Sequence, residues 1–284
     1  MIDEQTVWDD IWPVVERLIA ATVAEDPQTM RQLLHPGGQA ADALALYGHD
    51  VFDVLLKTVL GRERLGLTRA IEGDGGATAF IEYAWPDPAG GSGYTAVDVV
   101  AVRLAQSAGG WRVVEINPAG ADLPLNSMRA TSILAGTQVM SDEGKLPAEP
   151  WILPIALYAG LLQLPLAPGA AADAVEELLL PGLQARQFGF LAQLAARRLW
   201  RDFVAAAAPD LERPGAWAAA VEVIMGEQSN RGETQAAVSR YYRASLGGVS
   251  ARVRQIRAAL AIVPFDERYT DLKTTEIIYK ESDT

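Results

Sequence analysis

Arginine is the residue type with the clearest chemical pattern in this sequence of 284 residues. Between residues 231 and 257 the chain contains one acidic residue, Glu233, and six arginines: Arg231, Arg240, Arg243, Arg252, Arg254 and Arg257. Guanidinium groups bind phosphate oxygens, and they bind O6 and N7 of guanine where they reach the major groove. The pattern indicates a locally positive surface that suits an anionic partner. The alternative is an arginine-rich, solvated helix face with no partner.

The remainder of the chain is acidic. The formal net charge is −12, and residues 1–184 carry −14 whereas residues 185–284 carry +2. A surface of this charge repels polyanions, so nucleic-acid binding by the whole molecule is disfavoured. Any such binding is expected only in the C-terminal part.

Carboxylates within apolar stretches are the candidates for acid–base chemistry. Asp98 interrupts the apolar run 97–102, and Glu82 and Glu115 lie in similar surroundings. A buried carboxylate has a raised pKa and can serve as a general base. Because side chains alternate between the two faces of a strand, the alternative is that each carboxylate faces solvent.

The two histidines, His35 and His49, lack the spacing of metal ligands, so no metal site is predicted. His49 with Asp98 is the one pair we can propose for catalysis in a shared cavity. Tyr83 and Trp85 lie two residues apart, on one face of a predicted strand, where they could line a pocket for a flat ligand. Core packing is the alternative for both.

Several common chemistries are excluded by absent motifs. The chain has no cysteine, which rules out disulfides, thiolate nucleophiles and cysteine-ligated zinc. It has no glycine-rich dinucleotide motif, no phosphate-binding loop, no Gly-x-Ser-x-Gly and no HExxH. No cofactor is therefore predicted.

No membrane partner is predicted either. No apolar run approaches the roughly 18 residues that a bilayer span needs. The first residues are acidic and lack the basic start of a signal peptide. A cytoplasmic location is the expectation.

The elements that position these residues change type along the chain. Apolar residues at helical spacing predict helices over 8–24, 27–34 and 39–60. Stretches typical of strands follow, separated by glycine- and proline-containing turns, at residues 64–72, 77–85, 94–105 and 111–116. Helices followed by a meander of strands predict an α+β fold with an antiparallel sheet.

This order of elements, with the closing strand Gly-Trp-Arg-Val-Val-Glu-Ile-Asn-Pro at 110–118, resembles the nuclear-transport-factor-like (SnoaL-like) cone fold. The resemblance covers roughly residues 5–118. It implies three helices packed on a curved antiparallel sheet, a pocket for a small molecule that Tyr83, Trp85 and Asp98 would line, and homodimers formed through the open sheet face. The family contains isomerases, dehydratases and non-catalytic binding modules, so the fold alone does not give a function.

The C-terminal half is predicted to be helical. Residues 119–150 contain proline, glycine and unpatterned polar residues, which indicates a linker between a domain at 1–118 and a domain at 151–284. Periodicity predicts helices at about 151–164, 170–179, 183–206, 215–228, 234–242 and 246–261.

The last two helices carry the arginines. Thr234 and Ser245 are expected to cap them through their hydroxyl groups. The two helices are joined by little more than Arg243 and Ala244. With so short a connection they are expected to cross, which gives a helix-turn-helix over about 234–261. The second helix has an apolar stripe that leaves Arg252 and Arg254 to one side.

Residues 217–270 resemble an uncharacterised helix-turn-helix family. Its pattern is a Trp-Ala-Ala helix, T-x-x-x-(V/I)-x-x-Y-(Y/F), a serine-capped helix with I-R-x-x-L, and F-D-x-R-Y. The matching residues are Trp217, Ala218, Ala219, Thr234, Val238, Tyr241, Tyr242, Ser245, Ile256, Arg257, Leu260, Phe265, Asp266, Arg268 and Tyr269. Because guanidinium groups outside the apolar stripe of such a unit can meet phosphates, contact with DNA is expected through Arg240, Arg243, Arg252, Arg254 and Arg257.

Two departures from that pattern lead to further expectations. Arg243 stands where the family has its turn glycine, which predicts against a left-handed residue at this position. Gly247 and Gly248 replace side chains that would face base edges. We therefore expect contact with phosphates without reading of sequence.

The leading hypothesis is a non-enzymatic regulatory or scaffolding protein of the cytoplasm. Its cone would bind a small molecule or partner, and its helical half would contact DNA or a second protein. The rival hypothesis is a cone-fold isomerase or dehydratase, with the helical half as a lid or dimerisation unit. The third is a protein-interaction module with neither activity.

Overall fold

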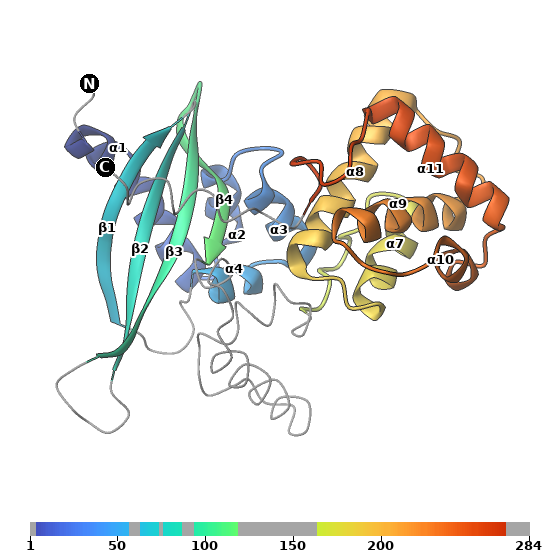
Figure 1. The fold of residues 1–284 in the computed structure, drawn as a ribbon. Helices are drawn as coiled ribbons and strands as arrows, with labels where there is room; N and C mark the ends of the chain where they lie inside the picture. Colours follow the sequence, from blue (N-terminus) through green and yellow to red (C-terminus); the bar gives the residue numbers. More distant parts are fainter. Residues whose placement is uncertain (1–3, 57–62, 74–75, 87–93, 119–163, 271–284) are drawn as a thin grey trace, which may run out of the picture. The chain divides into compact units, whose positions relative to one another are not determined.

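The computed structural model describes residues 4–56, 63–73, 76–86, 94–118 and 164–270, which divide between two compact units (Figure 1). The described residues up to 118, together with 164–170, belong to the first unit, and residues 171–270 belong to the second. The predicted linker at 119–150 and the predicted helix at 151–164 lie outside the described residues, apart from Leu164.

The first unit opens with helices α1 (Glu4–Val23), α2 (Pro27–Leu33), α3 (Gln39–Tyr47) and α4 (Asp50–Leu55). The start of α2 follows from two adjacent residues. Asp26 Oδ1 accepts the backbone N–H groups of Gln28 and Thr29, both at 3.1 Å. Pro27 occupies the first helical position, where its missing N–H costs nothing.

The single helix predicted over 39–60 is wrong. Gly48 ends α3 with a φ of 75°, a conformation that glycine adopts without the steric cost of a Cβ. A new helix, α4, begins at Asp50, so four described helices precede the sheet instead of three.

The sheet has the antiparallel topology that the sequence predicts. Strands β1 (Glu63–Gly73), β2 (Gly76–Pro86), β3 (Tyr94–Ser107) and β4 (Gly110–Pro118) pair in the order β1-β2-β3-β4. Every neighbouring pair is antiparallel. The first unit is therefore α+β.

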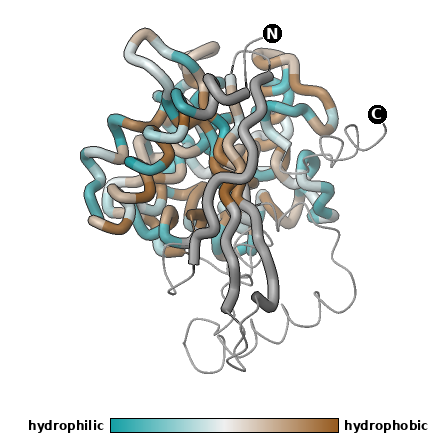
Figure 2. The backbone as a smooth tube through the Cα atoms, turned by 90° about the vertical axis from the view of Figure 1, so that its left-hand side faces the viewer, coloured by the Kyte–Doolittle hydropathy of each residue, from teal (hydrophilic) through white to brown (hydrophobic). Residues whose placement is uncertain are grey.

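One face of the sheet supplies half of the core. In the register of the strands, Ala79 and Ile116 both pair with Val102, and Ile81 pairs with Val100. All five side chains are buried. Helix α1 packs on β1, β2 and β4, and α3 packs on β4. Along the described helices, apolar and polar stretches, brown and teal in Figure 2, alternate as expected for helices that bury one face.

The second unit is helical over its described residues, with α7 (Ala174–Ala185), α8 (Phe190–Ala207), α9 (Pro214–Gln228), α10 (Gln235–Tyr241) and α11 (Leu246–Leu260). The predicted boundary between helices at 179–183 is wrong. Helix α7 continues through Pro181 because Leu179, Leu180 and Leu183 are anchored in buried positions on both sides of it. The break comes later, where Gln187 has a φ of 58°.

Aromatic rings hold α8 and α9 together. Trp200, Phe203 and Trp217 form a mutually tilted cluster with ring centroids 5.2 to 5.9 Å apart. Val249, Val253 and Ile256 of α11 are buried in the same core, as the predicted stripe requires. Among the described helices, none combines the length and the apolar composition needed to cross a membrane.

Two glycines make room for Tyr242, the residue that ends α10. A Cβ on Gly182 of α7 would lie 2.9 Å from the ring atom Cζ of Tyr242, with the hydroxyl closer still. A Cβ on Gly215 of α9 would lie 2.9 Å from the backbone oxygen of Tyr242. Real Cβ atoms do not approach other atoms this closely, so glycine at both positions is what lets α7, α9 and α10 meet.

This packing gives a stability test with a matched control. Gly182→Ala is expected to lower the free energy of unfolding by about 1–3 kcal/mol, because the new methyl displaces the Tyr242 ring. Gly226→Ala, in α9 with no atom within 4 Å of its added Cβ, is expected to raise it by about 0.5–1 kcal/mol. Urea denaturation measures both. Equal effects of the two substitutions would contradict the packing argument, and a Tyr242→Phe background should reduce the cost at Gly182.

Candidate nucleic-acid interface

The ends of α10 and α11 are set by the two predicted caps. Thr234 Oγ1 accepts the backbone N–H of Ala237 at 3.2 Å, and Ser245 Oγ accepts that of Gly248 at 3.3 Å. Each bond serves an amide of the first turn, where no carbonyl lies four residues earlier within the helix. Both caps are confirmed, and the helix is interrupted between Tyr241 and Leu246 as expected.

The turn between the helices is a left-handed one, and the prediction against it at Arg243 is wrong. Arg243 has a φ of 53°, its N–H donates to the oxygen of Arg240 at 3.1 Å, and the N–H of Ala244 donates to the oxygen of Ser239 at 2.9 Å. These two bonds form the Schellman pattern that usually ends in glycine. Arginine adopts this conformation because the backbone bonds and the packing of Tyr242 fix the turn around it.

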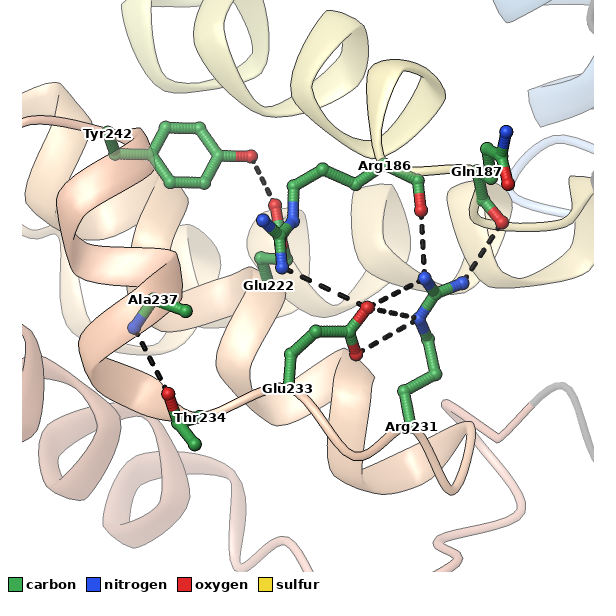
Figure 3. A network of polar contacts seen from close by, with 8 residues as sticks. All are labelled: Arg186, Gln187, Glu222, Arg231, Glu233, Thr234, Ala237 and Tyr242. Carbon is green, nitrogen blue, oxygen red and sulfur yellow. Dashed lines mark hydrogen bonds and ion pairs between the residues drawn. The ribbon is translucent and has the colours of Figure 1, made fainter.

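A buried carboxylate anchors this turn from α9. The Tyr242 hydroxyl donates to Glu222 Oε2 at 2.6 Å, and Arg186 forms an ion pair with the other oxygen of Glu222 (Figure 3). The Glu222 side chain is 0% exposed. Burial raises the pKa of Glu222 above its usual range, although both partners act in the opposite direction.

Arg231, the first arginine of the sequence pattern, has a structural role. Its guanidinium donates to Glu233 Oε1 at 2.7 Å and to the backbone oxygens of Arg186 and Gln187 at 2.8 and 3.0 Å (Figure 3). The hydrogen bonds from Arg231 hold the pKa of Glu233 below its usual value. This cluster joins the end of α7 to the segment that leads into α10.

The five predicted nucleic-acid contacts fall into two groups. Arg240, Arg243 and Arg254 are exposed, and among the described residues none of their side chains has a hydrogen-bond or ion-pair partner. Arg257 pairs with Glu227 of α9. Arg252 lies over the ring of Trp217, 4.7 Å from its centroid, and donates to the oxygen of Gly248 at 3.3 Å. Three of the five arginines are thus available to an anion in solution.

No acidic residue lies in the segment that carries these arginines, residues 234–260. On α11, Gly247, Ser250 and Arg254 follow one another at helical spacing, so they share a side of the helix. Ser250 Oγ lies 3.2 Å from Gln235 Oε1, which links this side to the start of α10. The surface presents guanidinium donors, which bind phosphate.

The Phe-Asp-x-Arg-Tyr sequence after α11 is structural. Arg268 donates to Asp266 Oδ2 at 2.6 Å and to the oxygen of Leu260 at 2.9 Å, which closes the end of α11. Tyr269 donates to Asp202 of α8 at 2.8 Å. The hydrogen bond from Arg268 lowers the pKa of Asp266. These contacts explain Asp266, Arg268 and Tyr269 of the motif without a ligand, whereas Phe265 is exposed.

The candidates in the α+β unit are only partly described. His49 lies between α3 and α4, with Nε2 3.0 Å from Asp50 Oδ1 and 3.9 Å from Glu25 Oε2. Tyr83 and Asp98 are backbone partners across β2 and β3, but their side chains and that of Trp85 lie outside the described residues. The pairing of His49 with Asp98 therefore stays a prediction. Over the described part of the chain, no group of three or more His, Asp or Glu residues could hold a metal ion.

Comparisons of the chain with protein-family models, curated proteins and solved structures found no match. The site is therefore assigned from its geometry alone. Its organising residue, Glu222, is not among the residues singled out from the sequence. Glu222 lies in the apolar run Ala-Val-Glu-Val-Ile of α9. The signal that the sequence offered for Glu222 was an acidic residue among the apolar residues of a helix.

The left-handed turn gives a second test. Arg243→Gly is expected to raise the free energy of unfolding by about 1 kcal/mol, because glycine lacks the Cβ that disfavours this conformation. Arg240→Gly, inside α10, removes the same charge and is expected to lower it by about 1 kcal/mol. Thermal or urea unfolding compares the two. A destabilised Arg243→Gly would mean that the arginine side chain makes a stabilising contact.

The buried carboxylate gives a test by pH. Because the pKa of Glu222 is raised in the folded state, the folded chain binds the proton more tightly than the unfolded chain. The contribution of protonated Glu222 to the free energy of unfolding is greatest below the unfolded pKa of about 4.5. It falls as the pH rises from there through the raised pKa of the folded state. Urea unfolding of wild type and Glu222→Gln at several pH values checks this. The wild type should lose stability relative to Glu222→Gln as pH rises; a constant or opposite difference would refute the shift.

Proposed function

We propose that α10 and α11 form a nucleic-acid-binding helix-turn-helix, and that the protein is a non-enzymatic regulatory or scaffolding protein of the cytoplasm. In this proposal the exposed arginines of the turn and of α11 hold the phosphate backbone. The four-residue connection between α10 and α11 has the length typical of such units.

The observation that carries the proposal is the state of Arg243. Its side chain is exposed and unpaired among the described residues, although its backbone adopts a left-handed conformation that costs a non-glycine residue about 1 kcal/mol. The two backbone hydrogen bonds of the turn offset that cost, and the charged side chain takes no part in them. An unpaired, solvent-facing cation beside Arg240 is suited to a phosphate that arrives from outside.

The binding should depend little on sequence. The first turn of α11 carries Gly247 and Gly248, which have no side chain to reach a base edge. Arg254 lies about two turns further along the helix. Contacts with phosphates position a protein on nucleic acid, whereas contacts with base edges specify the site. We therefore propose backbone binding that is weakened by the acidity of the rest of the chain.

For the α+β unit we propose the nuclear-transport-factor-like cone, with a small molecule or partner in its concave face. The support is the element order, in which helices α1 to α4 precede a meander of four antiparallel strands. The packing of α1 across β1, β2 and β4 also suits this fold. Dimerisation through the open face of the sheet belongs to the same proposal.

A fluorescence-anisotropy titration of the full chain against a short labelled DNA duplex tests the proposal. Binding is expected at about 50 mM salt with a dissociation constant of about 10⁻⁶ M, and a second duplex of unrelated sequence should bind equally. Arg243→Gln and Arg254→Gln should each weaken binding and reduce the slope of log K against log salt by about 1.

Arg31→Gln is the matched control, since it removes one exposed positive charge from α2 in the other unit. It should leave both the affinity and the salt slope unchanged. If neither duplex binds at about 50 mM salt, the nucleic-acid function is wrong.

A further inference from the structure

A groove of about 820 Å³ lies between the end of α8, the start of α9 and one side of α11. Its lining is largely apolar: alanines of α8 and α11, among them Ala207 and Ala258, are exposed along it, and the buried rings of Phe203 and Trp217 lie beneath them. The volume falls within the range typical of sites for small organic ligands. None of the proposed phosphate contacts lines this groove.

Arg252 is the cationic group of the groove, and no described residue serves as its counter-ion. Among the described residues its guanidinium forms no ion pair, its one hydrogen bond goes to the oxygen of Gly248, and its buried Nε has no acceptor. A guanidinium has five N–H donors, so most of its hydrogen-bonding capacity is unused.

Other shielded arginines of this unit differ from Arg252 in one respect. Arg186 is paired with Glu222, and Arg197 is paired with Glu176. Charges that are shielded from water normally have such a partner because desolvation is costly. An anion from solution would give Arg252 the negatively charged partner that carboxylates of the chain give to these other arginines.

The geometry of Arg252 also suits a ligand that has both a charge and an apolar body. The guanidinium lies over the Trp217 ring at 4.7 Å, and stacking on a ring face leaves the N–H groups at its edge free to donate. Exposed alanines of the lining, among them Ala258 and Ala259, offer contact area to an apolar group.

The other charged residue of the lining limits the ligand's charge. Asp210 is the acid among the lining residues, and its Oδ1 accepts the N–H of Glu212 at 2.9 Å. One carboxylate near one guanidinium disfavours a ligand with two negative charges. The groove therefore matches a single anionic group better than a phosphate monoester.

We propose that this groove binds an organic monoanion, a carboxylate or sulfonate with an aromatic or aliphatic body, whose charged group contacts Arg252. The site is separate from the proposed nucleic-acid surface. Its test uses no nucleic acid, so the two proposals succeed or fail independently.

The probe is 8-anilinonaphthalene-1-sulfonate, an aromatic monoanion whose fluorescence rises on binding, titrated into the full chain. N-phenyl-1-naphthylamine, which has the same rings without the sulfonate, reports apolar contact alone. Arg252→Gln should weaken binding of the anionic probe at least about tenfold, the equivalent of one hydrogen bond between charged groups, while changing the neutral probe little.

Arg254→Gln is the matched control, because it removes one charge from the same helix outside the groove. It should leave the affinity for both probes unchanged. Ala258→Trp, at an exposed position on the groove wall, should fill the space and weaken both.

An equal effect of Arg252→Gln and Arg254→Gln on the anionic probe would overturn the proposal, as would the absence of saturable binding to the wild type. Circular dichroism checks that each variant is folded. If Arg252→Gln does not fold, Ala258→Trp decides, since an unchanged affinity there places the probe elsewhere and refutes the site.

Discussion

The arrangement of the helical unit depends on the desolvated carboxylate of Glu222. Its partners come from different parts of the chain, Arg186 from the end of α7 and Tyr242 from the end of α10. An unsatisfied carboxylate in this position would cost several kilocalories per mole, so three helices must meet in one geometry. That geometry fixes Tyr242, and the next residue, Arg243, begins the turn into α11.

The arginines of this unit differ chiefly in how far water can reach them. Those inside, such as Arg186 and Arg231, are tied to carboxylates or backbone oxygens and serve as structural links. The exposed arginines, Arg240, Arg243 and Arg254, have no such partner among the described residues, so their charges face the solvent. Arg252 lies between the two groups, shielded by Trp217 yet without a carboxylate partner in the described part of the chain. One residue type therefore provides structure and, in the two functions we propose, a surface for a polyanion and a site for a small anion.

Local sequence features predicted the elements well where the cause of an element is itself local. Strand alternation placed β1 to β4, and the hydroxyl caps of Thr234 and Ser245 placed the starts of α10 and α11. The errors have a common origin. A boundary was predicted between residues 179 and 183, although buried leucines keep α7 intact through Pro181, and Arg243 was expected to avoid a conformation that Tyr242 and the backbone bonds impose on it. Tertiary packing overrides propensity at both positions.

The sequence by itself determined the α+β order of the first unit, the positive segment without acids at 234–260, and the two caps. These depend on residues within a few positions of one another. The tertiary structure decided which arginines are neutralised and where a groove opens, because Glu222 lies 20 residues from Tyr242 and Glu227 lies 30 from Arg257. Pairing over such distances follows from how helices pack, and helix packing is set by the shapes of the buried side chains as a group.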